Sequence, residues 1–124
     1  MATKIEIERG DMYPDITLDK ENGIFEIKGI SIPQNAREFY TPVLDFLDEY
    51  SRDPNEVTHF VFNFRYFNIS SSKMILYILY KLRELKDFGK TVLVTWCYDD
   101  DDILEAGNDF EHMSKMEFQF KETF

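Results

Sequence analysis

The chain has 124 residues, of which 44% are hydrophobic and 16% are aromatic. This length and composition suit one domain over residues 1–124 with a buried core, and they argue against disorder. The formal net charge is −10, and the 14 Lys and Arg residues are scattered along the chain. Because such a charge repels phosphates, we expect neither nucleic acid nor a membrane surface as a partner; a protein with a basic face fits better.

The cysteine count and the N-terminal residues bear on the compartment. Cys97 is the only cysteine, which excludes an internal disulfide and fits a reducing environment. The first residues alternate polar and apolar instead of forming a signal peptide, and no segment approaches the length of a membrane span. We therefore expect a cytoplasmic protein. His59 and His112 lack metal-ligand spacing to each other and to Cys97, so we expect structural or surface roles for both.

Alternating polar and apolar residues predict strands in the first quarter of the chain. Residues 5–7 indicate an edge strand. Apolar residues at 16–18 and 24–30 flank a polar turn at 19–23 that ends in glycine. This arrangement predicts a β-hairpin.

Apolar residues at helical spacing over 39–50 predict the first helix. Asn35, followed three residues later by Glu38, resembles a capping box and indicates where this helix begins. Pro42 lies inside the helical pattern. It either kinks the helix or marks a restart, with Thr41 as the cap and Pro42 at the first helical position.

The rest of the chain alternates strands and helices. The predicted elements are a strand at 59–67, a helix with its stripe over 75–85, a strand at 91–98, a short helix over 103–110 and a strand at 116–120. Gly89 stands where a glycine C-terminal cap belongs. The order predicts an α/β sandwich with a mixed sheet, in which the strands at 59–67 and 91–98 are parallel neighbours joined by a right-handed helical crossover.

Three consecutive hydroxyls, Ser70, Ser71 and Ser72, occupy the turn between the strand at 59–67 and the following helix. The start of a helix offers unpaired N–H groups and a partial positive charge, so it favours anions. A serine here can cap the helix, help to hold an anion, or carry a phosphate. Lys73 lies close enough in sequence to offset part of a phosphate's charge.

Four consecutive acids, Asp99, Asp100, Asp101 and Asp102, follow the strand at 91–98. They fit either a solvated helix start or a site for Mg²⁺ or a partner. If the two long strands are parallel neighbours, these acids and the serine turn lie at the same edge of the sheet, where ligands tend to bind in open α/β sheets. A phosphate on the turn would then be repelled by the acids.

Several segments, in chain order, resemble one family. They are Ser31–Ala36, Phe39-Tyr40-x-Pro42, Tyr66–Lys73, Trp96–Asp102 and Glu105–Phe110. Over nearly the whole chain they resemble the SiaC-like bacterial regulatory phosphoproteins. The resemblance implies a STAS-like fold, similar to anti-sigma-factor antagonists, with an N-terminal hairpin and helices packed on the sheet. It also implies partner switching in cyclic-di-GMP signalling: a kinase phosphorylates the turn, a PP2C-type phosphatase reverses this, and the protein modulates a diguanylate cyclase.

The sequence departs from this family at the turn. The family reads Asn-Thr-Ser-Ser there, with the threonine as the expected phosphate acceptor, and Ile69 stands in its place. In the anti-sigma-factor antagonists the acceptor is a serine in an Asp-Ser-Ser-Gly turn, and its second serine falls on Ser70. The resemblance therefore favours Ser70 as the acceptor and Ser71 as the second choice. The alternative is a member that has lost the switch and binds its partner constitutively.

The sequence contains no glycine-rich phosphate loop, no G-x-S-x-G motif and no Cys–His pairing, which favours a binding protein over an enzyme. We predict a non-enzymatic regulator without a cofactor or metal. The predicted binding surface is Tyr66, Asn68, Ile69, Ser72, Lys73 and the acids 99–102. Two alternatives remain open: a Mg²⁺-dependent enzyme or phospho-acceptor built on those acids, and a scaffold without a switch.

Overall fold

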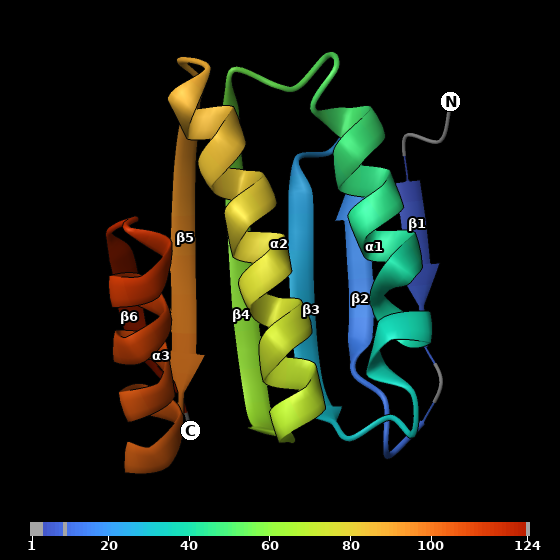
Figure 1. Cartoon of the computed structure of the whole chain (residues 1–124), viewed down its shortest axis with the longest axis vertical. Helices are drawn as coiled ribbons and strands as arrows, with labels where there is room; N and C mark the ends of the chain where they lie inside the picture. The colour runs from blue at the N-terminus through green and yellow to red at the C-terminus, as the bar shows by residue number, and fades with distance from the viewer. Residues whose placement is uncertain (1–3, 9, 124) are drawn as a thin grey trace.

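A computed structural model describes residues 4–8 and 10–123, which form one six-stranded sheet and three helices (Figure 1). The elements in chain order are β1 (Lys4–Ile7), β2 (Asp15–Asp19), β3 (Ile24–Ser31), α1 (Ala36–Tyr50), β4 (Val57–Phe67), α2 (Ile69–Asp87), β5 (Thr91–Tyr98), α3 (Asp101–Ser114) and β6 (Phe118–Glu122). The predicted α/β class, N-terminal edge strand and element order are confirmed.

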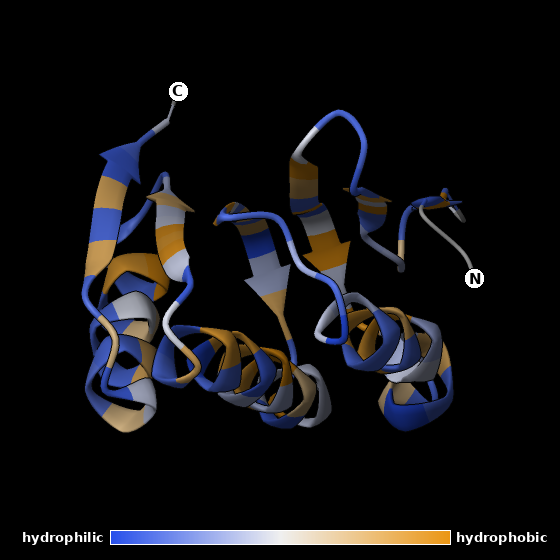
Figure 2. Ribbon diagram, turned by 90° about the horizontal axis from the view of Figure 1, so that it is seen from above, coloured by the Kyte–Doolittle hydropathy of each residue, from blue (hydrophilic) through white to orange (hydrophobic). Residues whose placement is uncertain are grey.

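The strands lie in the sheet in their order along the chain. β1, β2 and β3 are antiparallel neighbours, whereas β3, β4, β5 and β6 are parallel neighbours. The predicted hairpin and the predicted parallel pair, joined by a right-handed crossover, are therefore confirmed (Figure 1). β4, β5 and β6 are added one after another in the same direction across the sheet, each by a right-handed crossover. For this reason the described helices all pack on one face of the sheet (Figure 2).

The core lies between the sheet and the helix layer. On β4, alternate residues Phe60, Phe62 and Phe64 are fully buried against the helices, as the period of two predicted. Trp96 on β5 lies beside them, with its ring centroid 5.7 Å from that of Phe62 and its Nε1 donating to the carbonyl of Ile103 at 2.9 Å. This bond fixes the start of α3 against the central strands.

The boundaries of α1 resolve one open alternative. Asn35 is the N-cap, because its side chain accepts a hydrogen bond from the backbone N–H of Glu38 at 3.0 Å. The helix then runs without a break past Pro42 to Tyr50, so the suggested restart at Pro42 is wrong. The Thr41 hydroxyl donates to the carbonyl of Arg37 at 2.6 Å, which is the back-bond of a residue inside a helix and not a cap.

Both later helices are longer than their apolar stripes indicated. α2 ends in a Schellman motif, in which Gly89 has φ 94° and the N–H of Lys90 reaches the carbonyl of Leu85 at 3.1 Å, which confirms the predicted glycine cap. α3 extends to Ser114, where the Arg83 guanidinium from α2 donates to the Ser114 carbonyl at 3.0 Å. A side chain of α2 therefore satisfies the terminal carbonyl of α3.

Candidate functional site

A β-bulge sets the orientation of the turn between β4 and α2. Gly29 pairs with Phe64 and Ile30 pairs with Tyr66, so Arg65 is an extra residue without a partner on β3. Because side chains alternate between the two faces of a strand, one extra residue reverses the faces that follow it. Phe67 accordingly packs in the core, with its ring centroid 5.3 Å from that of Phe64, whereas Tyr66 is 57% exposed.

The cap of α2 is Asn68, and none of the three serines has this role. Its side-chain oxygen accepts from the backbone N–H of Ser71 at 2.9 Å and from the hydroxyl of Ser70 at 3.1 Å. The Ser72 hydroxyl donates to the carbonyl of Ile69 at 2.6 Å. The expectation that a serine caps this helix is therefore wrong. Asn68, which precedes the helix, already accepts a hydrogen bond from one of the free N–H groups of the first turn.

Ser71 is fully buried and belongs to a chain of hydroxyls between three elements. Its hydroxyl donates to the carbonyl of Ser31, at the end of β3, at 3.0 Å, because a carbonyl can only accept. The Ser31 hydroxyl must then donate to Ser71 Oγ at 2.8 Å, and Tyr40 of α1 must donate to Ser31 Oγ at 2.6 Å. Burial raises the pKa of Tyr40 well above its ordinary value, so this phenol keeps its proton.

This arrangement bears directly on the two candidate acceptors. The proton of Ser71 is engaged and its oxygen is closed off from solvent, which argues against the expectation that it accepts a phosphate in this conformation. Ser70, one residue earlier, is exposed in the first turn of α2. Of the two candidates, the geometry leaves Ser70 as the accessible hydroxyl.

Two side chains beside Ser70 complete the exposed surface of the turn. Ile69 is the first residue of α2 and is 89% exposed, which is unusual for so large an apolar side chain. Lys73 is exposed, and its Nζ lies 6.0 Å from the centroid of the Tyr77 ring. Among the described residues, no carboxylate forms an ion pair with Lys73.

The acids at the end of β5 form the start of α3. Asp100 is the N-cap and accepts from the N–H of Ile103 at 2.9 Å, while Asp101 and Asp102 occupy the first turn. Asp99 precedes the cap, and the whole run is exposed. Within residues 4–8 and 10–123, no group of three or more His, Cys, Asp or Glu side chains could hold a metal ion. Asp100, Asp101 and Asp102 thus form the cap and the first turn of α3.

The serine turn and the acids do lie at one edge of the sheet. β4 and β5 are parallel neighbours, and α2 and α3 both begin at the lower edge in Figure 1. Sequence reasoning missed the contributions of Ser31 and Tyr40, which come from distant elements. A sequence signal existed, since Ser31 follows Phe25 and Ile27 at the alternating, inward-facing positions of β3, but its partners could not be named without the fold.

Comparison with known proteins identifies the family. The model of the SiaC family regulatory phosphoproteins matches residues 7–123. The chain belongs to this family. An uncharacterized protein of Pseudomonas aeruginosa (strain UCBPP-PA14) is 30% identical over 86 residues, which are 69% of this chain and 68% of that protein.

Solved SiaC structures share the fold of this SiaC-family chain. Apo-SiaC from Pseudomonas aeruginosa superposes with a TM-score of 0.89 at 25% identity, over 97% of this chain and 99% of the other. SiaC in the crystal structure with the diguanylate cyclase SiaD, of which it is the activator, also has a TM-score of 0.89 at 25% identity, over 96% of this chain and 99% of the other. The SiaC-like, STAS-like fold expected from the sequence is confirmed. No helix in the described part of the chain is long and apolar enough to cross a membrane.

Proposed function

We propose that this chain is a non-enzymatic cytoplasmic regulator that binds a diguanylate cyclase and changes its activity. Membership of a family of regulatory phosphoproteins supports the proposal, as does the likeness to a SiaC that activates the cyclase SiaD. The residues that would carry the contact are those exposed around the start of α2, namely Tyr66, Ile69, Ser70 and Lys73.

The observation that carries the proposal is the accessibility of Ser70 at the start of α2. Its hydroxyl is exposed and lies where a helix favours negative charge. A phosphate there would add a charge of about −1.5 to −2 directly beside the exposed Ile69. A dedicated kinase would add this phosphate and a PP2C-type phosphatase would remove it. Phosphorylation would then change the surface that the cyclase contacts.

One observation favours a second candidate function. Ile69 cannot be phosphorylated, and its exposed side chain suits permanent contact with a partner. In that case the chain would bind the cyclase constitutively, as a scaffold without a switch. The two candidates share the partner and the surface, and they differ in whether the state of Ser70 matters.

Isothermal titration with the diguanylate cyclase of the same organism separates these cases. We expect Ser70→Ala to bind like the unphosphorylated wild type and Ser70→Asp to bind about tenfold more weakly or more tightly. Ser51→Asp is the matched control, because Ser51 is exposed at the far end of α1 and receives the same charge. Intact-mass analysis of protein from the native host checks for the phosphate. No binding by any form would refute the proposal, and equal affinities with no phosphate would leave the constitutive binder.

A further inference from the structure

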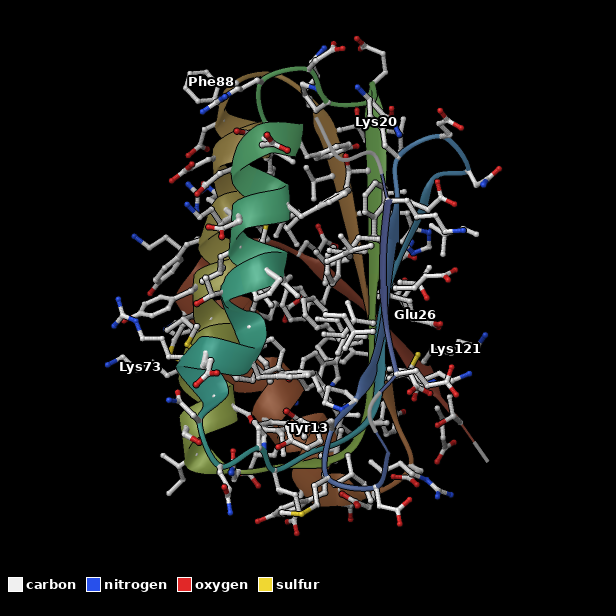
Figure 3. All side chains as sticks on the ribbon, turned by 90° about the vertical axis from the view of Figure 1, so that its right-hand side faces the viewer. Tyr13, Lys20, Glu26, Lys73, Phe88 and Lys121 are labelled. Atoms are coloured by element: carbon white, nitrogen blue, oxygen red, sulfur yellow. The ribbon has the colours of Figure 1, made fainter. Side chains whose placement is uncertain are left out.

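The second face of the sheet, which we call the open face, is covered by no helix of the described residues (Figure 2). Because side chains alternate along a strand, the neighbours of the core residues in each strand belong to this face. Glu26 of β3 and Lys121 of β6 project from it, away from the helices (Figure 3). The open face is therefore accessible to other molecules.

A pocket of about 260 Å³ lies on the open face, where β2, β3 and β4 meet the end of β5. Asp15, Lys28 and Asn63 form one row across three strands, because Asp15 is paired with Lys28 and Lys28 with Asn63 in the register of the sheet. Arg65, the extra residue of the bulge, lies next to this row on β4. Asp99, directly after β5, completes the charged lining.

The polar groups of this pocket are not used within the described part of the chain. Lys28 and Arg65 form no ion pair with any described residue, although Asp15 lies directly across from Lys28. The Asn63 side chain has no hydrogen bond to a described residue either. Two cations, two carboxylates and an amide therefore meet in one pocket with their bonding capacity available to a ligand.

A second hollow enlarges the space. It has a volume of about 410 Å³, shares Asp15, Lys28 and Arg65 with the first pocket, and continues past Tyr13. Sites for small molecules typically have volumes of about 300–1,000 Å³. The space around the two cations is therefore large enough for a molecule bigger than a free ion.

We propose that this pocket binds a small phosphate monoester that also carries hydroxyl groups, such as a sugar phosphate. Lys28 and Arg65 would donate charged hydrogen bonds to the phosphate. A carboxylate can only accept, so Asp15 and Asp99 would accept from the hydroxyl groups, while the Asn63 amide can donate or accept. The inference goes beyond the proposed function and does not rest on it.

The two carboxylates decide which anion fits. They repel a bare phosphate ion, but they gain hydrogen bonds from a ligand whose hydroxyl groups reach them. The formal net charge of −10 also opposes anions, but salt screens this effect beyond a Debye length of about 8 Å, so the two adjacent cations dominate at the pocket. A polyanion would extend past these cations into the acidic surroundings, whereas a monoester would not.

NMR titration of ¹⁵N-labelled protein tests the ligand class with four probes: glucose 6-phosphate, glycerol 3-phosphate, inorganic phosphate and glucose. At least one of the two monoesters should shift the amide signals of Lys28, Asn63 and Arg65 saturably, with an affinity at least about fivefold higher than that of inorganic phosphate. Glucose should cause no saturable shift. Equal affinities for the monoesters and inorganic phosphate, or no saturable shift at these amides with either monoester, would overturn the inference.

Charge-neutralising variants test the pocket itself. Lys28→Gln and Arg65→Gln should each weaken binding of the better monoester about tenfold. Lys86→Gln is the matched control, because it removes the same charge from the last turn of α2, at the other end of the sheet (Figure 1), and it should bind within about twofold of wild type. An equal loss in all three variants would indicate a general charge effect and refute the site.

Asp15→Asn separates recognition of the hydroxyl groups from attraction of the phosphate. It should raise the affinity for inorganic phosphate, because one repelling charge is lost, and should reduce the preference for the monoester. Since Asp15, Lys28 and Arg65 are exposed, each variant should melt within about 2 °C of wild type. An increased preference of Asp15→Asn for the monoester would contradict the role assigned to this carboxylate and overturn the inference.

Discussion

A carboxylate placed at Ser71 should destabilise the protein strongly, whereas a carboxylate at the adjacent Ser70 should leave the stability nearly unchanged. Ser71→Asp removes the bond donated to the Ser31 carbonyl at 3.0 Å and displaces the oxygen that accepts from the Ser31 hydroxyl at 2.8 Å; each of these bonds contributes about 1 kcal/mol. It also places a charge where the side chain is fully buried and faces a carbonyl oxygen. Burial of the unpaired charge adds several kcal/mol, so we expect a loss of about 3–5 kcal/mol in the free energy of unfolding.

Ser70→Asp should leave the stability nearly unchanged. The mutation loses one exposed bond, to the Asn68 side chain at 3.1 Å. It gains a carboxylate in a first turn that now has no acid, which contributes about 0.3–1 kcal/mol through the helix dipole. The two effects offset each other, and we expect a change within about 0.5 kcal/mol of zero.

Urea denaturation followed by circular dichroism measures both variants, and thermal melts provide a second readout. For a chain of this size 1 kcal/mol corresponds to about 4 °C, so Ser71→Asp should lower Tm by about 12 °C or more. Ser71→Ala separates the charge from the lost hydrogen bonds and should cost about 1–2 kcal/mol. If Ser71→Asp were as stable as Ser70→Asp, the burial of Ser71 and the hydroxyl chain argued from it would be refuted.

Three further predictions concern the rest of the fold. Gly107→Ala should lower the unfolding free energy by about 1–3 kcal/mol despite the better helix propensity of alanine, because the new Cβ would lie less than 3.0 Å from three atoms of the Trp96 ring; an unchanged Tm would contradict this contact. Asp100→Ala should lower the free energy of unfolding by about 1 kcal/mol, because α3 loses its N-cap. Mg²⁺ should not raise the Tm of the wild-type protein, and differential scanning fluorimetry can check both expectations. The Asn22 side chain donates to Asp19 at 2.7 Å and holds the pKa of Asp19 below its usual value. The ionised Asp19 therefore contributes stability that is present above about pH 4 and is lost as the pH falls through the lowered pKa. Asn22→Ala should therefore flatten the acid limb of a plot of Tm against pH.

The elements that the sequence predicted best are those whose pattern is local. Alternate phenylalanines at 60, 62 and 64 marked β4, and its parallel pairing with β5 followed from the helix between them. The cap at Asn35 was readable because the acceptor and Glu38 lie within one turn of each other. Both features follow from the spacing of residues that are close together in the chain, so a single sequence is enough to predict them.

The features that the sequence did not predict depend on contacts between distant segments, or on a choice between neighbouring residues of similar capping propensity. The bulge at Arg65 lies opposite Gly29 of β3, a pairing that the sequence does not reveal, and it decides that Phe67 faces the core and Tyr66 faces solvent. Asn68 and the serines after it are all good N-caps, so propensity alone could not select Asn68. The partner of Ser71 is Ser31 of β3, 40 residues earlier, and Ser31 is in turn bonded by Tyr40 of α1; only the fold brings the three hydroxyls together.

The run of three serines illustrates why accessibility must be argued from the helix and not from the sequence motif. Each residue of a helix is rotated by about 100° from the one before it, so three consecutive side chains cannot share an environment. Ser70 consequently faces solvent, Ser71 enters the hydroxyl chain of the core, and Ser72 bonds back to the carbonyl of Ile69. A shift of the acceptor from the position of Ile69 to Ser70 would keep a phosphate beside Lys73, whereas a shift by one further residue would place it inside the protein. Of the two candidate acceptors, Ser70 and Ser71, the geometry of α2 thus leaves Ser70 as the one whose hydroxyl is open to solvent.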